Sequence, residues 1–377
     1  MITGLSLFLF IMCMVYVVLV LYMRAGWMRL PIIKPSTIVP QTKVSVIIAA
    51  RNEEDNIGRT LDCLMAQDFP KELLEIIVVD DHSTDRTNEI ILSYADRGVR
   101  LISLEAGDKL NSYKKYAINK AIDSSNGEII VTTDADCRMG PHWLKTIIHF
   151  MEANDLYMVS SPVSYHEEKS YFENLQTLEF LYLIGLGAAG IGNGNPTTCN
   201  GANLAYRKAV FYEMGGFKGI DELASGDDEL LLHKIAEKYA SRIGFCKARA
   251  AIVYTDAKEN LSAFLSQRRR WASKSTKYKD KRVVALGVCI WLFNLALLVN
   301  ILCFCWADPD AERLILLSIL MKIVVEFAFL YPVVSFADRK SLLFNLPLIS
   351  LMHSLYLVYI GILGNVGKYD WKGRSVK

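Results

Sequence analysis

Apolar residues gather in long stretches at the two ends of the chain, whereas the middle alternates short apolar blocks with polar segments. The first stretch, residues 5–23, contains no charged residue and is long enough to cross a bilayer as a helix. Three further stretches cover residues 283–306, 314–337 and 342–366. The pattern predicts a globular domain held between an N-terminal membrane anchor and a group of C-terminal membrane helices.

Basic residues flank the globular middle and predict its orientation. Arg24, Arg29 and Lys34 follow the first stretch, and the residues before it lack the basic region of a signal peptide. We therefore expect a retained anchor, with residue 24 onward in the cytosol. The basic run 268–282 directly precedes the second stretch, so we expect it to lie against anionic lipid on the same side.

The last apolar stretch leaves two topologies open. If residues 342–366 crossed the membrane, the basic tail 368–377 would lie outside, against the positive-inside rule. The Asn-Leu-Pro break at 345–347 favours a re-entrant or interfacial segment instead, and this topology returns the tail to the cytosol. We expect a multi-pass protein of the cell membrane with its globular domain in the cytosol.

Composition agrees with a membrane protein and argues against other classes. Hydrophobic residues make up 52% of the chain, and the mean hydropathy is +0.23. The eight cysteines are scattered without metal-ligand spacing, and those of the middle domain are expected to stay reduced in the cytosol. The net charge of +2 and a basic run that borders a membrane stretch give no indication of nucleic-acid binding.

The middle of the chain predicts an α/β fold. Short β-branched runs are typical of buried parallel strands, and each run is followed by a segment with helical character. Such strand–helix repetition builds a mostly parallel sheet with helices on both faces. We expect strands at 43–51, 74–81, 99–105 and 128–136, and helices at 52–67, 82–98 and 112–127, the first of them capped by Asn52.

Polar residues mark the carboxyl ends of three of these strands. Ligands of parallel sheets bind beyond the carboxyl ends of the strands, so we expect these side chains to converge on one edge. No GxGxxG motif follows the first strand and no GxxxxGK[ST] motif occurs, which argues against a dinucleotide oxidoreductase and a P-loop NTPase. The polar strand ends are Arg51-Asn52-Glu53, Asp80-Asp81 and Asp134-Ala135-Asp136.

The Asp-Ala-Asp segment at 134–136 indicates a cation site. Two ionised carboxylates one residue apart repel each other at the end of a buried strand, so a positive charge between them is expected. Mg²⁺ takes one or two carboxylates together with phosphate oxygens, and a bound diphosphate would complete such a site. A solvated surface turn is the other interpretation of the bare motif.

Several motifs in a fixed order resemble one enzyme family. They are VSVIIAARNEEDNI, IIVVDDHSTDRT, TTDADC, GANLAYRK, SGDDELLL and QRRRW. Together they resemble the membrane-bound family 2 glycosyltransferases, a group that includes cellulose, chitin and hyaluronan synthases, poly-N-acetylglucosamine synthases and ceramide glucosyltransferases. The resemblance covers about residues 43–275 and implies a GT-A fold, an α/β domain with a Rossmann-like, mixed and mostly parallel sheet.

The resemblance implies a binding site for a nucleotide-sugar donor. Asp80 and Asp81 are similar to the acids that hold the uracil and the ribose. Lys114 looks like a lysine that contacts the nucleotide, although Tyr113 replaces the glycine usual before it. The remaining implied donor contacts are Ala49, Arg51, Asn52, Glu53 and Asp134.

The resemblance also implies metal and catalytic positions. Asp136, with Asp134 beside it, would bind Mg²⁺ or Mn²⁺. Asp228 resembles the catalytic base of an acidic pair, and Asp227, which stands where glutamate is commoner, would face the acceptor. The Q-x-x-R-W signature, which borders the acceptor and the diphosphate in this family, corresponds here to Gln267, Arg270 and Trp271.

The residue types themselves suggest how such a reaction would proceed. The planar guanidinium of Arg270 matches phosphate oxygens and would stabilise charge on a leaving diphosphate. Asp228 would take the proton of the acceptor hydroxyl, a contribution of about 10²–10⁴-fold. Because no second carboxylate is assigned as a nucleophile, we expect a single displacement with inversion. From the helical pattern alone, Asp227 and Asp228 could equally be capping acids in the first turn of a helix.

Three further features of the sequence bear on the acceptor or on the membrane. The glycine-rich segment 187–203 is expected to be a flexible acceptor loop, with Asn203 as its best contact. Trp271 could instead be an interfacial belt residue. Lys322 and Glu326 stand four residues apart in an apolar stretch, so we expect them to pair, and a polar lining for a lipid head group or glycan is the alternative.

These inferences predict an inverting glycosyltransferase that uses a nucleotide-activated sugar, expected to be UDP-linked, on a lipid or lipid-linked acceptor at the cytosolic membrane face. A polysaccharide synthase that exports a glycan is the alternative, and a catalytically inactive nucleotide-sensing scaffold is the alternative from another class. The expected regions are an anchor at 1–24, a catalytic domain at 40–275, a basic linker at 276–282, membrane helices at 283–367 and a tail at 368–377.

Overall fold

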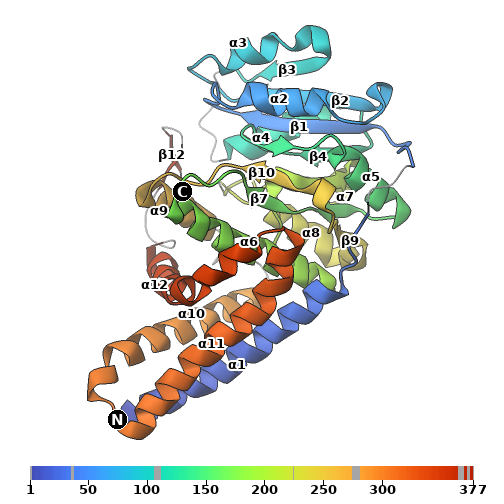
Figure 1. The fold of residues 1–377 in the computed structure, drawn as a ribbon. Helices are drawn as coiled ribbons and strands as arrows, with labels where there is room; N and C mark the ends of the chain where they lie inside the picture. Colours follow the sequence, from blue (N-terminus) through green and yellow to red (C-terminus); the bar gives the residue numbers. More distant parts are fainter. Residues whose placement is uncertain are drawn as a thin grey trace. The chain divides into compact units, whose positions relative to one another are not determined.

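The computed structural model describes residues 2–34, 38–105, 112–223, 225–273, 281–363, 369–371 and 374–376. The chain forms two compact units, which are described separately (Figure 1). The helical unit comprises Met1–Met28, Lys169–Ala189 and Lys258–Tyr369, and the sheet unit comprises Arg29–Glu168, Gly190–Ala257 and Asp370–Lys377. Residues 276–280 of the expected linker and residues 368, 372, 373 and 377 of the expected tail lie outside the described residues.

A seven-stranded sheet forms the centre of the sheet unit, with the strand order β3-β2-β1-β4-β8-β6-β9. Neighbouring strands run parallel except at β8, which is antiparallel to both β4 and β6. The expected mixed, mostly parallel sheet is thereby confirmed. The strands are β1 (Val44–Ala50), β2 (Leu74–Asp80), β3 (Val99–Ser103), β4 (Ile129–Thr132), β6 (Met158–Ser160), β8 (Leu204–Arg207) and β9 (Ile243–Phe245).

A second, three-stranded sheet contains β5, the strand that follows β4 in the chain. Its order is β5-β10-β7, where β10 is antiparallel to β5 and parallel to β7. These strands are β5 (Arg138–Met139), β7 (Val163–Tyr165) and β10 (Val253–Thr255). The helices of the sheet unit are α2 (Ile57–Met65), α3 (Thr87–Leu92), α4 (Tyr113–Ser124), α5 (Trp143–Ala153), α7 (Lys208–Glu213) and α8 (Glu229–Tyr239).

Burial of both sheet faces follows from the sequence of the strands. Six of the seven residues of β1 are buried, and β-branched side chains dominate β1, β2 and β4. Such runs occur where helices cover both sides of a sheet. Parallel registers align the strand ends, because Ala50 pairs with Asp80 and Ile47 pairs with Thr132. The acids that follow β2 and β4 therefore emerge near the end of β1.

Two predicted helices begin later than their sequences suggested. Asn52 is not the cap of the first helix: it has a positive φ of 50°, and α2 begins at Ile57 with Asn56 as its N-cap residue. The amide oxygen of Asn52 instead accepts from the backbone N–H of Thr84 at 2.8 Å. This bond spans 32 residues of the chain and holds Asn52 in the loop before the helix. The two loops after β1 and β2 are consequently tied together at the sheet edge.

The helical unit contains the long apolar helices. Five helices of the described chain are long and apolar enough to cross a membrane: Thr3–Arg29, Tyr171–Gly192, Val283–Leu302, Pro309–Phe336 and Lys340–Ile362. The sequence patterns had indicated four of these regions and missed Tyr171–Gly192. That helix is 72% buried along its most apolar window, against 22–39% for the others, so it offers little surface to lipid.

The helices of this unit are α1 (Ile2–Arg29), α6 (Tyr171–Gly192), α9 (Leu261–Ala272), α10 (Lys281–Leu302), α11 (Pro309–Phe336) and α12 (Leu346–Leu363). Helices α1, α10 and α11 run side by side (Figure 1). The ring of Tyr16 on α1 stacks on that of Phe293 on α10, and the thiol of Cys13 on α1 donates a hydrogen bond to the backbone carbonyl of Ser318 on α11. The 3₁₀ turns are Lys71–Leu73, Ala95–Arg97, Gly201–Asn203, Ala240–Arg242, Arg249–Ala251, Phe304–Trp306 and Lys340–Asn345, and two short strands, β11 (Tyr369–Trp371) and β12 (Arg374–Val376), end the described chain.

Pro347 does not interrupt a helix. It stands in the first turn of α12, where proline is tolerated because the N–H that it lacks has no intrahelical partner. From there α12 continues to Leu363. The expected break at this proline is therefore the beginning of a helix, and the crossing or re-entry of this segment stays a prediction.

Lys322 and Glu326 form the buried ion pair that their spacing predicted. The Lys322 ammonium donates to Glu326 Oε1 at 2.6 Å and to the carbonyl and hydroxyl oxygens of Ser350 at 2.9 and 3.0 Å. The Tyr16 hydroxyl donates to the same carboxylate oxygen at 2.6 Å. These bonds join α1, α11 and α12 and use all three donors of the lysine.

Candidate active site

The acid pair after β2 is built into the turn that follows the strand. Asp80 Oδ1 accepts from the backbone N–H of Ser83 at 3.1 Å, and its Oδ2 accepts from the Asn88 amide at 3.0 Å. Asp81 Oδ1 lies 2.8 Å from His82 Nδ1. Both aspartates are buried. Asp80 therefore shapes the turn, and Asp81 is held through its histidine neighbour.

The residues after β1 line the same edge. The Arg51 guanidinium donates to the carbonyl oxygens of Asp81 and His82 at 2.7 and 2.9 Å. The backbone N–H of Glu53 donates to Thr87 Oγ1 at 2.7 Å. Ala49 is the one position of β1 that is not fully buried. The structure thus brings the expected donor-binding residues of β1 and β2 together.

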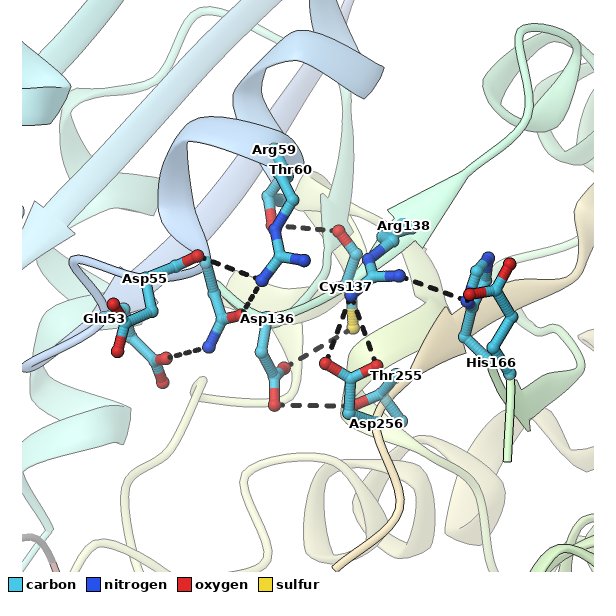
Figure 2. A network of polar contacts seen from close by, with 12 residues as sticks. Glu53, Asp55, Arg59, Thr60, Asp136, Cys137, Arg138, His166, Thr255 and Asp256 are labelled. Carbon is cyan, nitrogen blue, oxygen red and sulfur yellow. Dashed lines mark hydrogen bonds and ion pairs between the residues drawn. The ribbon is translucent and has the colours of Figure 1, made fainter. Parts of the chain in front are cut away.

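Asp134 and Asp136 follow β4 and are half-buried. Their carboxylate oxygens and the thiol of Cys137 lie within 4.8 Å of one another, the arrangement among the described residues that could hold a metal ion. Asp136 Oδ2 accepts from Thr255 Oγ1 at 3.3 Å (Figure 2), which ties the motif to β10. Arg138 of β5 forms an ion pair with Asp256, the residue after β10, at 3.2 Å. Figure 2 shows the two side chains facing each other.

Lys114 joins the acids of two segments. Its ammonium donates to Asp134 Oδ1 at 2.8 Å and lies 3.3 Å from Asp227 Oδ2. Burial alone would lower the pKa of Lys114, but the carboxylates of Asp134 and Asp227 raise it well above its usual value. The lysine is therefore charged, and it holds together two carboxylates that come from positions far apart in the chain.

Asp228 is fixed by two backbone donors. It is the N-cap residue of α8, where its Oδ1 accepts from the N–H of Glu229 at 2.7 Å. Its Oδ2 accepts from the N–H of Gly201 at 2.9 Å, and the Gly201 carbonyl accepts from Thr132 Oγ1 at 2.9 Å. Asp228 is thus a capping acid of the helix, as the helical pattern allowed, but it and Asp227 stand before the first turn, because α8 begins at Glu229.

Gly201 leaves no room for a side chain. A Cβ atom there would stand 3.3 Å from Asp227 Oδ2 and 3.3 Å from the Cβ of Asp228, tighter than most real contacts. The glycine allows its peptide to lie between Thr132 of β4 and the Asp228 carboxylate. One peptide group thereby connects the strand that carries the Asp-Ala-Asp segment to the expected base.

Lys115 holds the loop before α8. Its side chain is buried, and its ammonium donates to the carbonyl oxygens of Leu223 and Ser225 at 2.5 and 2.7 Å. These carbonyls stand shortly before Asp227 in the chain. The neighbouring lysines of α4 therefore act on one loop, Lys114 through a carboxylate and Lys115 through the backbone. The sequence analysis missed Lys115 and Gly201, since neither contact leaves a local pattern.

Asn203 is not accessible to an acceptor substrate. It is fully buried. Its amide donates to the carbonyl oxygens of Pro162 and Ala251 at 2.7 and 2.8 Å and accepts from Trp143 Nε1 at 2.9 Å. The expected acceptor role of Asn203 is therefore wrong for this structure. The expected loop 187–203 is also partly helix, because α6 extends to Gly192.

Gln267, Arg270 and Trp271 lie on α9 in the helical unit, and all three are half-buried. The other expected site residues lie in the sheet unit. The structure thus gathers the strand-end acids, Lys114 and Asp228 in one unit, and it arranges the three signature side chains on one helix of the other.

Comparisons with known proteins agree with this architecture. Residues 45–215 match the model of the family described as "Glycosyl transferase family 2". Among curated proteins, "Probable glycosyltransferase YdaM" of Bacillus subtilis is 28% identical over 239 residues, which are 61% of this chain and 54% of that protein. "Hyaluronan synthase" of Streptococcus pyogenes is 25% identical over 242 residues, 61% of this chain and 56% of that protein.

A lipid-directed relative is found as well. "Beta-monoglucosyldiacylglycerol synthase" of Nostoc sp. is 24% identical over 230 residues, 61% of this chain and 48% of that protein. The aligned region thus spans about half the length of these curated relatives. Among solved structures, "Mannosyltransferase PcManGT from Pyrobaculum calidifontis in complex with GDP-Man and Mn2+" is 18% identical with a TM-score of 0.61 and covers 94% of this chain and 99% of that one. This likeness confirms the GT-A fold.

Proposed function

Because residues 45–215 form a family 2 glycosyltransferase domain, we propose that this membrane protein transfers a sugar from a nucleotide-activated donor to a lipid or lipid-linked acceptor. The observation that supports this proposal most strongly is the set of carboxylates at the strand ends. Asp134, Asp227 and Asp228 lie around the Lys114 ammonium, and Asp136 lies beside Asp134. An excess of negative charge of this kind suits a divalent cation and the diphosphate that it carries.

The donor is proposed to bind along the edge formed by β1, β2 and β4. Asp81, Arg51 and Glu53 stand on neighbouring loops there, with Asp80 supporting the turn. We assign the nucleoside to these residues and to Ala49 and Asn52, and the diphosphate side to Lys114 and Asp134. A UDP-linked sugar is the donor that we expect.

The residues fit a hard dication such as Mg²⁺ or Mn²⁺. Asp134 and Asp136 would hold it with oxygen atoms. Burial, with the nearby Asp136 and Asp134 carboxylates, raises the pKa of the Cys137 thiol well above its usual value. The oxygen ligands of the two aspartates are those that a hard cation prefers. The bound ion would offset the charge that develops on the leaving diphosphate. Manganese in the mannosyltransferase complex is consistent with this assignment.

Asp228 is proposed as the general base. Its two backbone hydrogen bonds fix the orientation of the carboxylate. The carboxylate takes the proton of the acceptor hydroxyl while the bond from that oxygen to the anomeric carbon forms and the bond to the diphosphate breaks. Asp227 faces the acceptor beside it. No carboxylate is assigned as a nucleophile, so the acceptor oxygen displaces the diphosphate in one step. A single displacement inverts the configuration at the anomeric carbon.

The roles of the signature residues on α9 are assigned from the family motif. Arg270 would bind the diphosphate with its planar guanidinium, and Gln267 and Trp271 would bind the acceptor. We propose that the catalytic domain faces the cytosol, as the basic residues near α1 predict. The lipid-directed relative supports a lipid acceptor, and the hyaluronan synthase relative makes a polysaccharide the alternative.

A donor panel tests the proposal. The full-length protein in detergent, with membrane lipids added as acceptors, is incubated with UDP- and GDP-sugars and Mn²⁺ or Mg²⁺, and released nucleoside diphosphate is measured. We expect release with one donor and its loss when EDTA is present. Label that extracts into organic solvent indicates a lipid product, and label retained as polymer indicates a polysaccharide synthase. No release from any donor would contradict the proposal and favour an inactive scaffold.

A further inference from the structure

We propose that a buried ion pair between Glu179 of α6 and Arg268 of α9 positions the side chains of Gln267 and Trp271. This inference rests on the proposed function, since it concerns the residues to which that function assigns the acceptor. Glu179 and Arg268 are separated by 89 residues in the chain and belong to the same helical unit. Neither residue was a candidate in the sequence analysis.

The two charged side chains are removed from solvent. Arg268 is 1% exposed and Glu179 is 7% exposed, and the Arg268 guanidinium donates to Glu179 Oε2. Arg268 had been expected in a basic collar that lies against lipid, and the structure corrects this expectation: the side chain points into the unit. A guanidinium at this depth needs a carboxylate partner, because burial of an unpaired charge is costly.

Arg268 contacts both residues of the signature that would touch the acceptor. Its Nη1 donates to Gln267 Oε1 at 3.3 Å. Its guanidinium carbon lies 4.2 Å from the centre of the Trp271 ring and 4.7 Å from the centre of the Phe264 ring. The guanidinium is thus held at one end by Glu179 and rests at the other on the tryptophan.

These contacts fix the direction in which the signature residues face. Arginine has donors and no acceptor, so the Gln267 amide must turn its oxygen toward Arg268. The amide NH₂ group of Gln267 then faces away and can donate to a hydroxyl or phosphate oxygen. The guanidinium covers one face of Trp271, and the centre of the Phe180 ring lies 5.9 Å from that of Trp271, so the indole is held in one orientation. The ion pair therefore orients one hydrogen-bond donor and one aromatic face.

Stability alone does not explain the Glu179–Arg268 ion pair. Buried ion pairs can often be replaced by apolar residues of similar size without loss of stability. Within the described chain, Glu179 Oε1 has no hydrogen-bond partner, which costs free energy. The Lys322–Glu326 pair of the same unit differs, because every donor of that lysine has an acceptor. An orienting role explains why an incompletely satisfied pair stands beside Gln267 and Trp271.

The test removes both charges together. In the Glu179→Gln, Arg268→Met double variant no buried charge is left unpaired, so we expect the melting temperature to stay close to that of the wild type. Transfer to the acceptor should fall by about 10²-fold, because small misplacements of positioning groups have effects of this size. The acceptor KM should rise, and the donor KM should stay unchanged. Arg268→Lys, which keeps the charge and loses the planar fork, should recover part of the loss.

A matched control and a readout that does not need activity complete the experiment. Lys322→Met with Glu326→Leu removes the other buried pair of the unit, which touches neither Gln267 nor Trp271, and should leave transfer unchanged. The second readout is quenching of Trp271 fluorescence by acrylamide. The contribution of Trp271 is obtained by subtracting the fluorescence of a Trp271→Phe protein, both in the wild type and in the Glu179/Arg268 double variant. Quenching of Trp271 should be stronger in the double variant.

The outcomes separate this inference from the proposed function. A folded double variant with wild-type transfer or wild-type Trp271 quenching would overturn the positioning role, whatever the donor panel shows. If the double variant does not fold, unchanged quenching in Arg268→Lys would overturn it equally. Increased quenching in a protein whose wild type releases no nucleoside diphosphate would keep the orienting contact and reject the glycosyltransferase function.

Discussion

Two groups of charges in this protein have opposite balances. In the helical unit, the Lys322 ammonium is matched by the Glu326 carboxylate, and the Ser350 oxygens satisfy its remaining donors. In the sheet unit, Asp134, Asp227 and Asp228 surround the Lys114 ammonium, and Asp136 lies beside Asp134. The first group is complete within the protein, whereas the second has carboxylate oxygens left over. We infer that a balanced group serves structure and an unbalanced group serves a ligand.

The comparison explains why spacing alone left both groups ambiguous. Lys322 and Glu326 lie one helical turn apart, and their pairing could be predicted, but the Ser350 and Tyr16 oxygens that complete it come from other helices. Asp134 and Asp136 form a motif that is also common in surface turns. Only the approach of Lys114 and the Asp227–Asp228 segment shows that the negative charge there exceeds the positive charge.

The largest effect is expected from the unbalanced group, at Asp228. In Asp228→Asn the amide oxygen can still accept a hydrogen bond from one of the two backbone N–H groups, but the side chain can no longer act as a base. Transfer should fall by about 10²–10⁴-fold, the usual contribution of a positioned general base, with little change in melting temperature. The measurement is the steady-state rate of product formation at saturating donor and acceptor.

Asp96→Asn is the matched control for Asp228→Asn, because Asp96 is an exposed aspartate of the same unit. It should transfer sugar at the wild-type rate. A rate for Asp228→Asn within a few-fold of the control would show that another group takes the proton, and Asp227 would be the next candidate.

Breaking the balanced group should affect stability instead of chemistry. Glu326→Leu leaves the Lys322 ammonium buried and unpaired, a change that costs about 3–5 kcal/mol in comparable buried pairs. The Lys322→Met, Glu326→Leu double variant should regain most of this loss. Thermal unfolding in detergent measures both. Equal stability of single and double variants would mean that water or lipid reaches the pair, and the contrast between the two regions would fail.

Lys114→Met should sharpen the comparison by making the unbalanced group more negative. Without its internal ammonium the acid cluster should bind Mn²⁺ alone more tightly, by about tenfold, since a unit charge a few ångströms away is worth at least one kcal/mol in a partly solvated site. Binding of the nucleotide sugar should weaken at the same time. Calorimetric titrations with Mn²⁺ and with donor measure the two effects, and weaker Mn²⁺ binding would contradict the account.

The smallest expected effect concerns the loop before α8. Lys115→Met removes the bonds to the Leu223 and Ser225 carbonyls, so the loop that carries Asp227 becomes less well placed. We expect kcat to fall by about tenfold with an unchanged donor KM, a modest share of what precise positioning can contribute. Lys120→Met, an exposed lysine on the same helix, is the control. Equal rates in both variants would show that the loop holds its position without Lys115.

Much of the sheet unit could be predicted from the sequence. The β-branched runs identified β1 to β4 within a few residues, because strands buried on both faces need such residues throughout. The convergence of Asp80, Asp81, Asp134 and Asp136 on one edge followed from the parallel order. Helix starts were less predictable: Asn52 and His82 have positive φ angles, and loop contacts delayed α2 and α3.

The contacts that complete the candidate site could not be predicted. Gly201 reaches Asp228 across 27 residues, and Arg268 reaches Glu179 across 89. Contacts of this range depend on the packing of elements, and no periodicity or motif encodes them. The role of Asn203 was wrongly predicted for the same reason, since the residues that bind and bury its amide are distant in the chain. The helix at Tyr171–Gly192 was missed because its glycine-rich end suggested a loop.

The central claim is that the carboxylates after β4 hold a divalent cation together with a nucleoside diphosphate. Electron paramagnetic resonance of Mn²⁺ with UDP, titrated with the full-length protein, tests it directly, because bound and free Mn²⁺ give different signals. The account predicts that the wild type removes free Mn²⁺ from solution when UDP is present and that Asp134→Asn with Asp136→Asn does not. Equal uptake by the wild type and this variant would contradict it.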